Sequence, residues 1–424
     1  MLIEKIKGKL QHNTNYVNGI LFTFFSFINN GINFFLLMIL ATYLSPEGYG
    51  HLNLFNNFVI IFTVLIPLAC TGYIANSFFR KEEKDFKQVI VTVFLIGISS
   101  FIFFIIIAII AGGCFENILG LNSRLQILAI CICFFQLFTT VNLDLWRLQE
   151  KPILYGIYSM LFVLSNFILT LLLIAKLNFD WEGRIYTQFI VGLIFCIISI
   201  IFLVKRNFLS FNKNKKQFFL KEILAYGLPL IPHMLSSWIR QGLDRYIINF
   251  FWNASAVGLF SFALNFGNII HMVGAAFNAS NSVSTYKILR ENSNDAKRQL
   301  RRQTIHLSLF FFIVALIVYF VSYIFIPIIF PQYTNTLPYL FPICFGAFFQ
   351  CIYYLFVNYL FYYKKTKSLM YTTFSVSILH FVLSFLLTKY SLLYIAYISL
   401  FSNFTICVII IIISQKYFPI YKKK

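Results

Sequence analysis

Charged residues are scarce in this sequence: 11% of its 424 residues are Asp, Glu, Lys or Arg, whereas 59% are hydrophobic. A soluble domain typically carries about a quarter charged residues. A water-soluble fold of this length is therefore excluded, because the chain has too few polar side chains to cover a large core. Acidic residues are the rarest, with 14 Asp and Glu against 34 Lys and Arg.

The signatures of several enzyme classes are also missing. The sequence has no Gly-x4-Gly-Lys-Ser/Thr phosphate loop, no His-Glu-x-x-His zinc motif and no Asp-x-Asp pair for a nucleotide-sugar. These absences exclude a self-contained ATP motor and give no indication of catalysis, a cofactor or a metal. The eight cysteines lie mostly in apolar runs and are expected to be core residues. No cleavable signal peptide is predicted, because the first apolar run is too long.

What is abundant is long uncharged sequence, and a run of 18 or more apolar residues is a candidate membrane span. The run 303–363 must hold two helices, since four prolines punctuate its middle. The sequence thus predicts an all-α integral membrane protein whose twelve transmembrane helices cover residues 17–44, 52–78, 88–112, 125–146, 153–175, 185–204, 223–250, 256–282, 304–328, 337–363, 368–388 and 391–414.

The basic residues predict the orientation of these helices. With the N-terminus in the cytoplasm, 28 of the 34 Lys and Arg fall in cytoplasmic segments and four, Arg124, Lys176, Arg184 and Lys389, fall outside. The other two, Arg240 and Arg245, lie within a predicted span. Cytoplasmic loops are the ones enriched in Lys and Arg. We therefore expect both termini in the cytoplasm. The net charge of +20 is explained by this sidedness, because basic residues are attracted to the anionic lipids of the inner leaflet. No nucleic-acid partner is predicted.

The longest polar stretch, residues 205–222, lies near the midpoint and is basic. We interpret it as a cytoplasmic linker between two six-helix lobes, residues 1–204 and 223–424. An even number of helices gives both lobes the same orientation, as in parallel repeats. A weak repeat agrees with this, because aligning Gly50 with Gly258 also matches Asn57 with Asn265.

The predicted seventh helix holds the most polar span residues. His233, Ser237, Arg240 and Asp244 are spaced to share one helix face, and Arg245 follows directly. Pro229 and Pro232 predict a kink or an unwound turn ahead of them. One interpretation is that Arg240 and Asp244, four residues apart, neutralise each other between packed helices. The other is a hydrated cationic site with a titratable carboxylate.

Other spans carry polar faces as well. In the fourth, Asp144 and Arg147 share a face, and Arg147 is also placed to reach the membrane interface. Asn30 and Asn33 share a face of the first helix, as do Asn265 and Asn268 in the eighth. Such amides either hold helices together or line a wet pathway. A lone span histidine such as His380 is expected to be a packing residue.

Three segments near the seventh helix carry a resemblance to a known family. Tyr-Gly-Leu-Pro-Leu-Ile-Pro-His (226–233), Leu-Asp-Arg-Tyr-Ile-Ile (243–248) and Val-Gly-Leu-Phe-Ser (257–261) resemble the Wzx-type O-antigen and polysaccharide repeat-unit flippases. These belong to the multidrug/oligosaccharidyl-lipid/polysaccharide exporter (MOP) superfamily. Leu-Ser-Pro-Glu-Gly-Tyr-Gly (44–50) is also similar to theirs, although Gly48 departs from the Ser-Pro-Glu-Glu-Tyr-Gly pattern.

The resemblance implies a MATE-like, V-shaped molecule with two pseudo-symmetric six-helix bundles around a central cavity. It implies a cargo of undecaprenyl-diphosphate-linked oligosaccharide, moved to the periplasmic leaflet of the bacterial inner membrane by alternating access. A polysaccharide polymerase and a chain-length regulator are the implied partners. The cationic cavity residues of the family map onto Arg240, Arg245 and, less closely, Arg147. Together with these, His233, Asn30, Asn33, Asn265 and Asn268 are the predicted substrate-binding residues.

Coupling to H⁺ or Na⁺ through Asp244 or Asp144 is a further hypothesis. Three alternatives remain open at this point. A drug/cation antiporter of the same superfamily would favour carboxylates over arginines in its cavity. An O-antigen polymerase or ligase would carry a large periplasmic loop, and a lipid II flippase would have two more helices.

Overall fold

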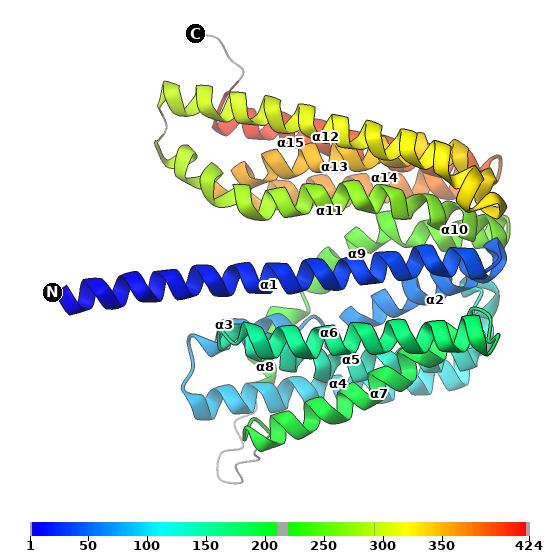
Figure 1. Cartoon of the computed structure of the whole chain (residues 1–424), viewed down its shortest axis with the longest axis horizontal. Helices are drawn as coiled ribbons and strands as arrows, with labels where there is room; N and C mark the ends of the chain where they lie inside the picture. Colours follow the sequence, from blue (N-terminus) through cyan, green and yellow to red (C-terminus); the bar gives the residue numbers. More distant parts are fainter. Residues whose placement is uncertain (1, 210–218, 292, 421–424) are drawn as a thin grey trace. The chain divides into compact units, whose positions relative to one another are not determined.

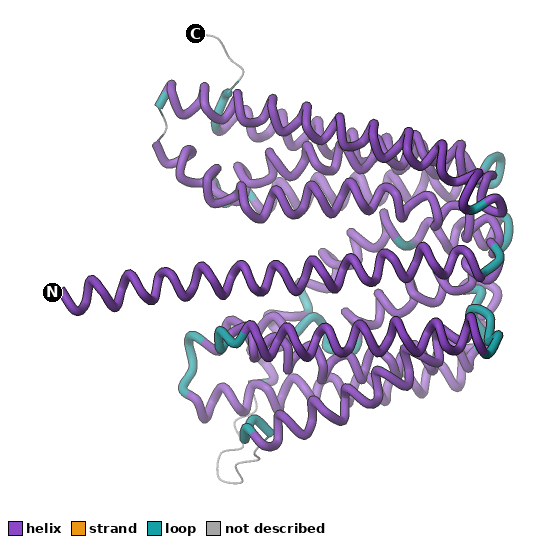
Figure 2. Tube along the Cα trace, in the orientation of Figure 1, coloured by secondary structure: helices purple, strands orange, loops and turns teal. Residues whose placement is uncertain are grey.

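The computed structural model describes residues 2–209, 219–291 and 293–420, with the side chains of 2–16, 117, 233, 279, 280 and 283 left aside. Within these ranges the chain is helical, with short turns between the helices and no strand (Figure 2). It divides into two compact units. Unit 1 comprises Met1–Leu44 and Leu54–Met234, and unit 2 comprises Ser45–Asn53 and Leu235–Lys424.

Unit 1 is a bundle in which α1 packs on α6, and α5 packs on both α4 and α7 (Figure 1). Its elements are α1 (Leu2–Tyr43), most of α2 (Pro46–Leu65), α3 (Thr71–Phe78), α4 (Glu83–Leu119), α5 (Ser123–Leu148), α6 (Pro152–Leu171), the π-helical turn η1 (Leu172–Lys176), α7 (Glu182–Lys205) and α8 (Leu220–Gly227). The predicted basic linker at 205–222 lies mostly outside the described residues, since 210–218 are not described.

Unit 2 is built around α13, which packs on α11, α12 and α15 (Figure 1). Its elements are the first turns of α2, most of α9 (Leu230–Gln241), α10 (Leu243–Phe251), α11 (Ala254–Glu291), α12 (Asn294–Ile329), the 3₁₀ turn η2 (Pro331–Thr336), α13 (Leu337–Tyr362), α14 (Thr366–Leu387) and α15 (Leu392–Tyr417).

Ten helical segments among the described residues are long and apolar enough to cross a membrane. They coincide with ten of the twelve predicted spans. The remaining two, 52–78 and 223–250, are helical but interrupted. Large apolar side chains cover the outside of the long helices, as with Ile110 on α4 (79% exposed) and Ile328 on α12 (72%). Such surfaces suit lipid and not water, so the chain is a multi-pass membrane protein.

The interruption of the second span is a feature that the sequence analysis missed. The helix stops before Pro67, whose ring cannot continue the hydrogen-bond ladder. Leu68 (φ 49°) and Ala69 (φ 55°) follow in the left-handed region, which costs L-residues about 1–2 kcal/mol each. Gly227, at the end of α8, packs against this break: a Cβ there would lie 2.5 Å from the Leu68 carbonyl oxygen. Packing inside unit 1 thus holds the strained turn.

Polar caps set the ends of several helices. Asn122 Oδ1 accepts from the Leu125 amide at the start of α5 (3.0 Å), and Ser293 Oγ accepts from the Ala296 amide at the start of α12 (3.0 Å). Each satisfies one of the unpaired first-turn donors. Gly120 ends α4 in the left-handed conformation that glycine adopts without strain.

Within unit 2 the first turns of α2 cross α11 at two glycines. A Cβ on Gly50 would lie 1.8 Å from the Ala254 carbonyl oxygen, and a Cβ on Gly258 would lie 1.8 Å from the Pro46 carbonyl oxygen. The crossing is reciprocal, with each glycine facing the carbonyl four residues before the other. It pairs the same two glycines that the sequence repeat aligns, so backbone contact explains why glycine stands at both positions.

Candidate functional site

The predicted seventh span is three helices, α8, α9 and α10. The first interruption, at Leu228 and Pro229, agrees with the predicted effect of proline, whereas Pro232 lies within the first turn of α9, where proline is tolerated. A second interruption falls at Gly242, between α9 and α10. It separates the two sets of polar residues that helical spacing had placed on one face.

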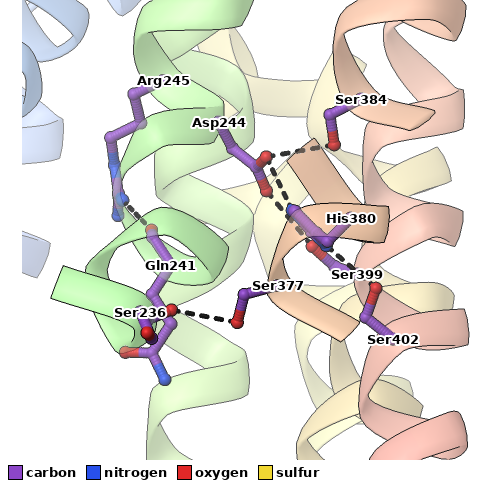
Figure 3. A network of polar contacts seen from close by, with 9 residues as sticks. All are labelled: Ser236, Gln241, Asp244, Arg245, Ser377, His380, Ser384, Ser399 and Ser402. Atoms are coloured by element: carbon purple, nitrogen blue, oxygen red, sulfur yellow. Dashed lines mark hydrogen bonds and ion pairs between the residues drawn. The ribbon is translucent and has the colours of Figure 1, made fainter. Parts of the chain in front are cut away.

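Asp244, in the first turn of α10, lies at the centre of a buried polar cluster in unit 2 (Figure 3). Only 2% of Asp244 and 1% of His380 is exposed, and His380 Nε2 lies 2.9 Å from Asp244 Oδ1. Ser384 Oγ donates to the same oxygen and Ser399 Oγ donates to Oδ2, both at 3.3 Å. Each carboxylate oxygen is therefore paired, as burial of a charge requires.

The far side of the imidazole continues the cluster into α15. His380 Nδ1 lies 3.0 Å from Ser402 Oγ, and one turn earlier on α14 Ser377 Oγ donates to the Ser236 carbonyl of α9 (3.1 Å). In Figure 3 these side chains converge from three directions on the space between α10, α14 and α15. We call Asp244, His380, Ser384, Ser399 and Ser402 the Asp–His cluster.

Of the two interpretations of Arg240 and Asp244, mutual neutralisation does not hold, because the turn at Gly242 interrupts the helix between them and Asp244 pairs with His380. The Arg240 side chain is half-buried, and its Nε is buried without a hydrogen-bond partner among the described residues. It lies close enough to Tyr353 and Tyr354 of α13 to interact with them electrostatically. His380, expected to be a packing residue, is buried and pairs with Asp244 and Ser402.

Arg245 lies next to Asp244 in the chain, but the two side chains point away from each other on α10 (Figure 3). Arg245 Nη1 donates to the Gln241 carbonyl (2.6 Å) and Nε donates to Ser261 Oγ (3.0 Å). Both acceptors are neutral, so these contacts hold the guanidinium in place without removing its positive charge.

The two asparagines predicted on α11 lie in different surroundings. Asn265 is buried and its Nδ2 donates to the Tyr49 hydroxyl (2.7 Å), so in this structure it joins α11 to the first turns of α2. Asn268, three residues on, is exposed. A turn later, His271 pairs with the Tyr354 hydroxyl at 2.6 Å. Tyr354 thus connects His271 on α11 with the surroundings of Arg240 on α9.

In unit 1 the predicted residues lie on α1 and α5. Asn30 and Asn33 are both exposed on α1, while Asn29 beside them donates to Ser159 of α6 (2.9 Å). Exposed amides within a span are unfavourable against lipid, which favours water at this face of α1. Arg147 Nη2 lies 2.7 Å from Asp144 Oδ1, and the pair is 58% and 25% exposed. The side chain of His233 lies outside the described residues.

The structure brings some predicted residues together and adds others. Asp244, Arg240 and Arg245 fall within one stretch of unit 2, and Asp144 with Arg147 forms a separate pair in unit 1. His380, Ser384, Ser399 and Ser402 were missed. Their signal was the i, i+4 and i, i+3 spacing of polar residues in two late spans, but nothing in the sequence linked them to Asp244. Among the described residues no group of three His, Cys, Asp or Glu side chains could hold a metal ion.

Comparison with known proteins connects this chain to polysaccharide synthesis. The profile of the family described as "Polysaccharide biosynthesis protein" matches residues 17–283, and that of the family "MatE" matches 229–386. A protein of the lsg locus of Haemophilus influenzae is 25% identical over 91% of this chain and 94% of its own length. A second membrane protein of that organism is 26% identical over 80% and 81%.

Solved structures show the same fold at low identity. The inward-facing conformation of a multidrug resistance MATE family transporter of the MOP superfamily has a TM-score of 0.72 at 15% identity, covering 92% of this chain and 94% of its own. The lipid II flippase MurJ, in an inward closed conformation, also has a TM-score of 0.72, at 14% identity with 93% and 87% covered. The chain therefore has the MATE/MurJ-like fold, and the predicted fold class is confirmed.

Proposed function

The chain belongs to the polysaccharide biosynthesis protein family of MOP-type transporters, and from this membership we propose that it is a repeat-unit flippase. In this proposal it carries undecaprenyl-diphosphate-linked oligosaccharides, destined for O-antigen or capsule, from the cytoplasmic to the periplasmic leaflet of the bacterial inner membrane. Its termini lie in the cytoplasm, and a polymerase with its chain-length regulator receives the flipped units.

The observation that carries the proposal is the cationic character of α9 and α10. Arg240 stands within a span with its Nε unpartnered, and its described neighbours are the neutral hydroxyls of Tyr353 and Tyr354. Arg245 adds a second guanidinium, which donates to the Gln241 carbonyl and the Ser261 hydroxyl and also interacts electrostatically with Asp244. The Asp244 carboxylate pairs with His380. Arginines in this setting suit an anionic cargo.

A diphosphate suits these residues on physical grounds. Moving its charge through a low-dielectric region is costly unless fixed positive charges compensate it. Arginine keeps its charge when buried and binds phosphate through two parallel hydrogen bonds. Because the cell interior is negative, each negative charge carried outward also gains about 2.3 kcal/mol per 100 mV.

The MatE profile supports a second candidate, a drug/cation antiporter of the same superfamily. A cationic drug needs carboxylates exposed to it. In unit 2 the carboxylate of Asp244 is buried and paired, whereas the arginines of α9 and α10 are half-buried. Arg240 and Arg245 would repel such a cargo, so we favour the flippase.

The test is deletion of the gene in its native strain, followed by complementation. We expect surface polysaccharide to disappear and lipid-linked repeat units to accumulate on the cytoplasmic leaflet. Wild type should rescue, Arg240→Ala should not, and Arg240→Lys and Arg245→Lys should rescue partly, since lysine keeps the charge but not the bidentate geometry. Arg124→Ala, at an exposed arginine of α5, is the matched control and should rescue fully.

Two outcomes would contradict the proposal. Single repeat units gathered on the periplasmic leaflet would mean that polymerisation, not translocation, had failed. Full rescue by Arg240→Ala would show that the Arg240 guanidinium is not required for transport of the diphosphate.

A further inference from the structure

We propose that the Asp–His cluster is a proton-binding site that takes one proton and no metal ion, and that this proton is the coupling ion of transport. The site is defined by contacts within unit 2 alone. Its use in coupling rests on the proposed function.

The hydrogen bonds of the cluster fit a carboxylate facing an imidazolium. In that form Nε2–H donates to Asp244 Oδ1 (2.9 Å) and Nδ1–H donates to Ser402 Oγ (3.0 Å). Both serine hydroxyls on the carboxylate donate as well, Ser384 to Oδ1 and Ser399 to Oδ2. Every polar hydrogen of His380 then has an acceptor. The hydrogen bonds that join His380, Asp244 and the three serines hold the proton at a defined place.

Burial makes the proton integral to the cluster. With Asp244 at 2% exposure and His380 at 1%, neither group has access to bulk water in this conformation. The protonated pair carries no net charge, whereas loss of the proton would leave a buried carboxylate whose direct contacts are neutral and on which Arg245 acts only from a distance. An uncompensated buried charge is strongly unfavourable. The proton therefore stays on the pair until α10 and α14 move apart or water enters.

The same geometry disfavours a metal ion. Na⁺, like other hard cations, needs several oxygen ligands around it. In the protonated cluster the hydrogens of His380, Ser384 and Ser399 all point at the Asp244 carboxylate, so a cation would meet the positive ends of these dipoles. The cluster also holds one carboxylate and one imidazole and no third ionisable ligand among the described residues.

The charged and titratable groups on the elements packed against the cluster are few. Arg245 interacts electrostatically with Asp244, and Tyr246 follows it on α10. Arg240 lies on α9. On α14 the other titratable side chains are the exposed Lys367 and Tyr371. On α15 they are Tyr394, Tyr397, Cys407, Lys416 and Tyr417. On α11 the imidazole of His271 is paired with the Tyr354 hydroxyl. His380 is the ionisable group in direct contact with the Asp244 carboxylate.

Release of the proton changes the charge next to the proposed cargo site. The N–H bond at Nε2 breaks, its electron pair stays on the nitrogen, and the proton passes to water. The sum of charges on Asp244, His380 and Arg245 then falls from +1 to 0. Since Arg245 follows Asp244 directly, the protonated cluster favours an anion beside Arg245 and the deprotonated cluster disfavours it. Proton and phosphate binding are therefore linked, reciprocally.

The first experiment reads the proton directly. The full chain, with ¹⁵N-labelled histidine and in lipid vesicles, is examined by solid-state NMR at neutral pH. We expect one imidazolium signal that His380→Gln removes and Asp244→Asn converts to a neutral imidazole. Exchange of K⁺ for Na⁺ at fixed pH should not shift it. His271→Gln is the control, because His271 faces a tyrosine hydroxyl and should leave the imidazolium signal in place.

Thermal unfolding of each variant establishes that it is folded, and Ser402→Ala provides a milder change should Asp244→Asn unfold. In Ser402→Ala the imidazolium signal should persist with a shifted Nδ1. A neutral His380 in the wild-type protein, or a signal that moves with Na⁺, would overturn the proton site whether or not the chain is a flippase.

The second experiment tests coupling, with undecaprenyl diphosphate as the probe in reconstituted vesicles. Because proton and cargo binding favour each other, a pH gradient that is acid on the side where the cargo is loaded should accelerate translocation by on the order of tenfold. A Na⁺ gradient should have no effect, and His380→Gln should keep only the rate measured without a gradient. Acceleration by Na⁺, or an unchanged pH response in His380→Gln, would reject the coupling role. Absence of translocation under all conditions would instead reject the proposed function, and the NMR result would stand.

Discussion

The hydroxyl of Tyr49 is the acceptor for Asn265 in the core of unit 2, and both residues are nearly inaccessible. A polar group buried in a span gains stability only while its partner remains. This pair therefore gives a test of whether Asn265 acts in packing or in cargo binding.

We expect Tyr49→Phe to lower the free energy of unfolding by about 1–3 kcal/mol, because Asn265 Nδ2 then lacks its acceptor. Asn265→Leu should cost a similar amount, and the double variant should cost less than the sum, as coupled pairs do. Thermal unfolding in detergent measures this. Tyr390→Phe, at a 69% exposed tyrosine, should change nothing. Strictly additive effects would contradict the pairing.

The residues of the candidate site show what sequence spacing can and cannot predict. Polar residues in the seventh span marked the right segment, because ionisable side chains in spans are rare. The partners were wrong, since the i, i+4 rule for Arg240 and Asp244 assumes an uninterrupted helix and Gly242 interrupts it. His380 lies 136 positions from Asp244. Only the packing of α10 on α14 brings the two together.

At the scale of helices, the crossing of α2 and α11 in unit 2 depends on two glycines with no space for a side chain. Gly50→Ala and Gly258→Ala should each lower the free energy of unfolding by about 1–3 kcal/mol, since the added methyl overlaps a backbone carbonyl that cannot rotate away. Gly113→Ala on α4 is the matched control. No atom lies within 4 Å of its Cβ, so it should be neutral or slightly stabilising. Thermal unfolding of the three variants measures these changes. Equal stability of all three would contradict the crossing.

The attachment of α8 to α3 in unit 1 gives a pH-dependent prediction. Glu222 Oε2 accepts from Lys81 Nζ (2.9 Å) and from the Tyr73 hydroxyl (2.7 Å). The hydrogen bond from Lys81, followed by that from Tyr73, lowers the pKa of the Glu222 carboxyl below its usual value. A lowered folded-state pKa stabilises the attachment above the unfolded pKa, which is about 4.3 for Glu, and the stabilisation is lost as pH falls through the folded value.

Hydrogen exchange over residues 219–228 measures this attachment. At neutral pH Glu222→Gln should speed exchange there, and the wild-type protein should match the variant only once the pH has fallen through the lowered folded-state pKa of Glu222. Glu83→Gln is the control, because Glu83 pairs with Lys87 within α4 alone and should leave α8 unchanged. Equal exchange in Glu222→Gln and wild type at neutral pH would show that the contacts do not hold α8.

Helix existence was predictable from uncharged runs, and helix interruption was only partly so. Pro229 correctly indicated a break in the seventh span, because a proline removes a donor and clashes with the preceding turn. Pro67 carried the same signal in the second span, which was nevertheless predicted as one uninterrupted helix over 52–78. What decides the outcome there is tertiary, namely the contact of Gly227 with the Leu68 carbonyl.

At the scale of the whole chain, the fold class followed from composition and from the count of apolar runs. The structures of a MATE transporter and of MurJ agree with it over more than 90% of this chain. Cargo and orientation are not fixed by fold, because one fold serves many functions. They depend on individual charges, which is why the arginines of α9 and α10 and the sidedness of Lys and Arg lead to separate tests.

The sidedness prediction is that 28 of the 34 basic residues face the cytoplasm, and single cysteines placed in turns can measure it. In a variant lacking the eight native cysteines, we expect Asn178→Cys and Thr334→Cys to react with a membrane-impermeant maleimide added to intact spheroplasts. Glu150→Cys and Lys364→Cys should react only after permeabilisation, since their turns carry the basic residues that stay inside. The four positions form a matched set, two for each side. A reversed labelling pattern would mean that the chain has the opposite orientation in the membrane from the one proposed. An anionic cargo would then reach the Arg240 guanidinium from outside the cell.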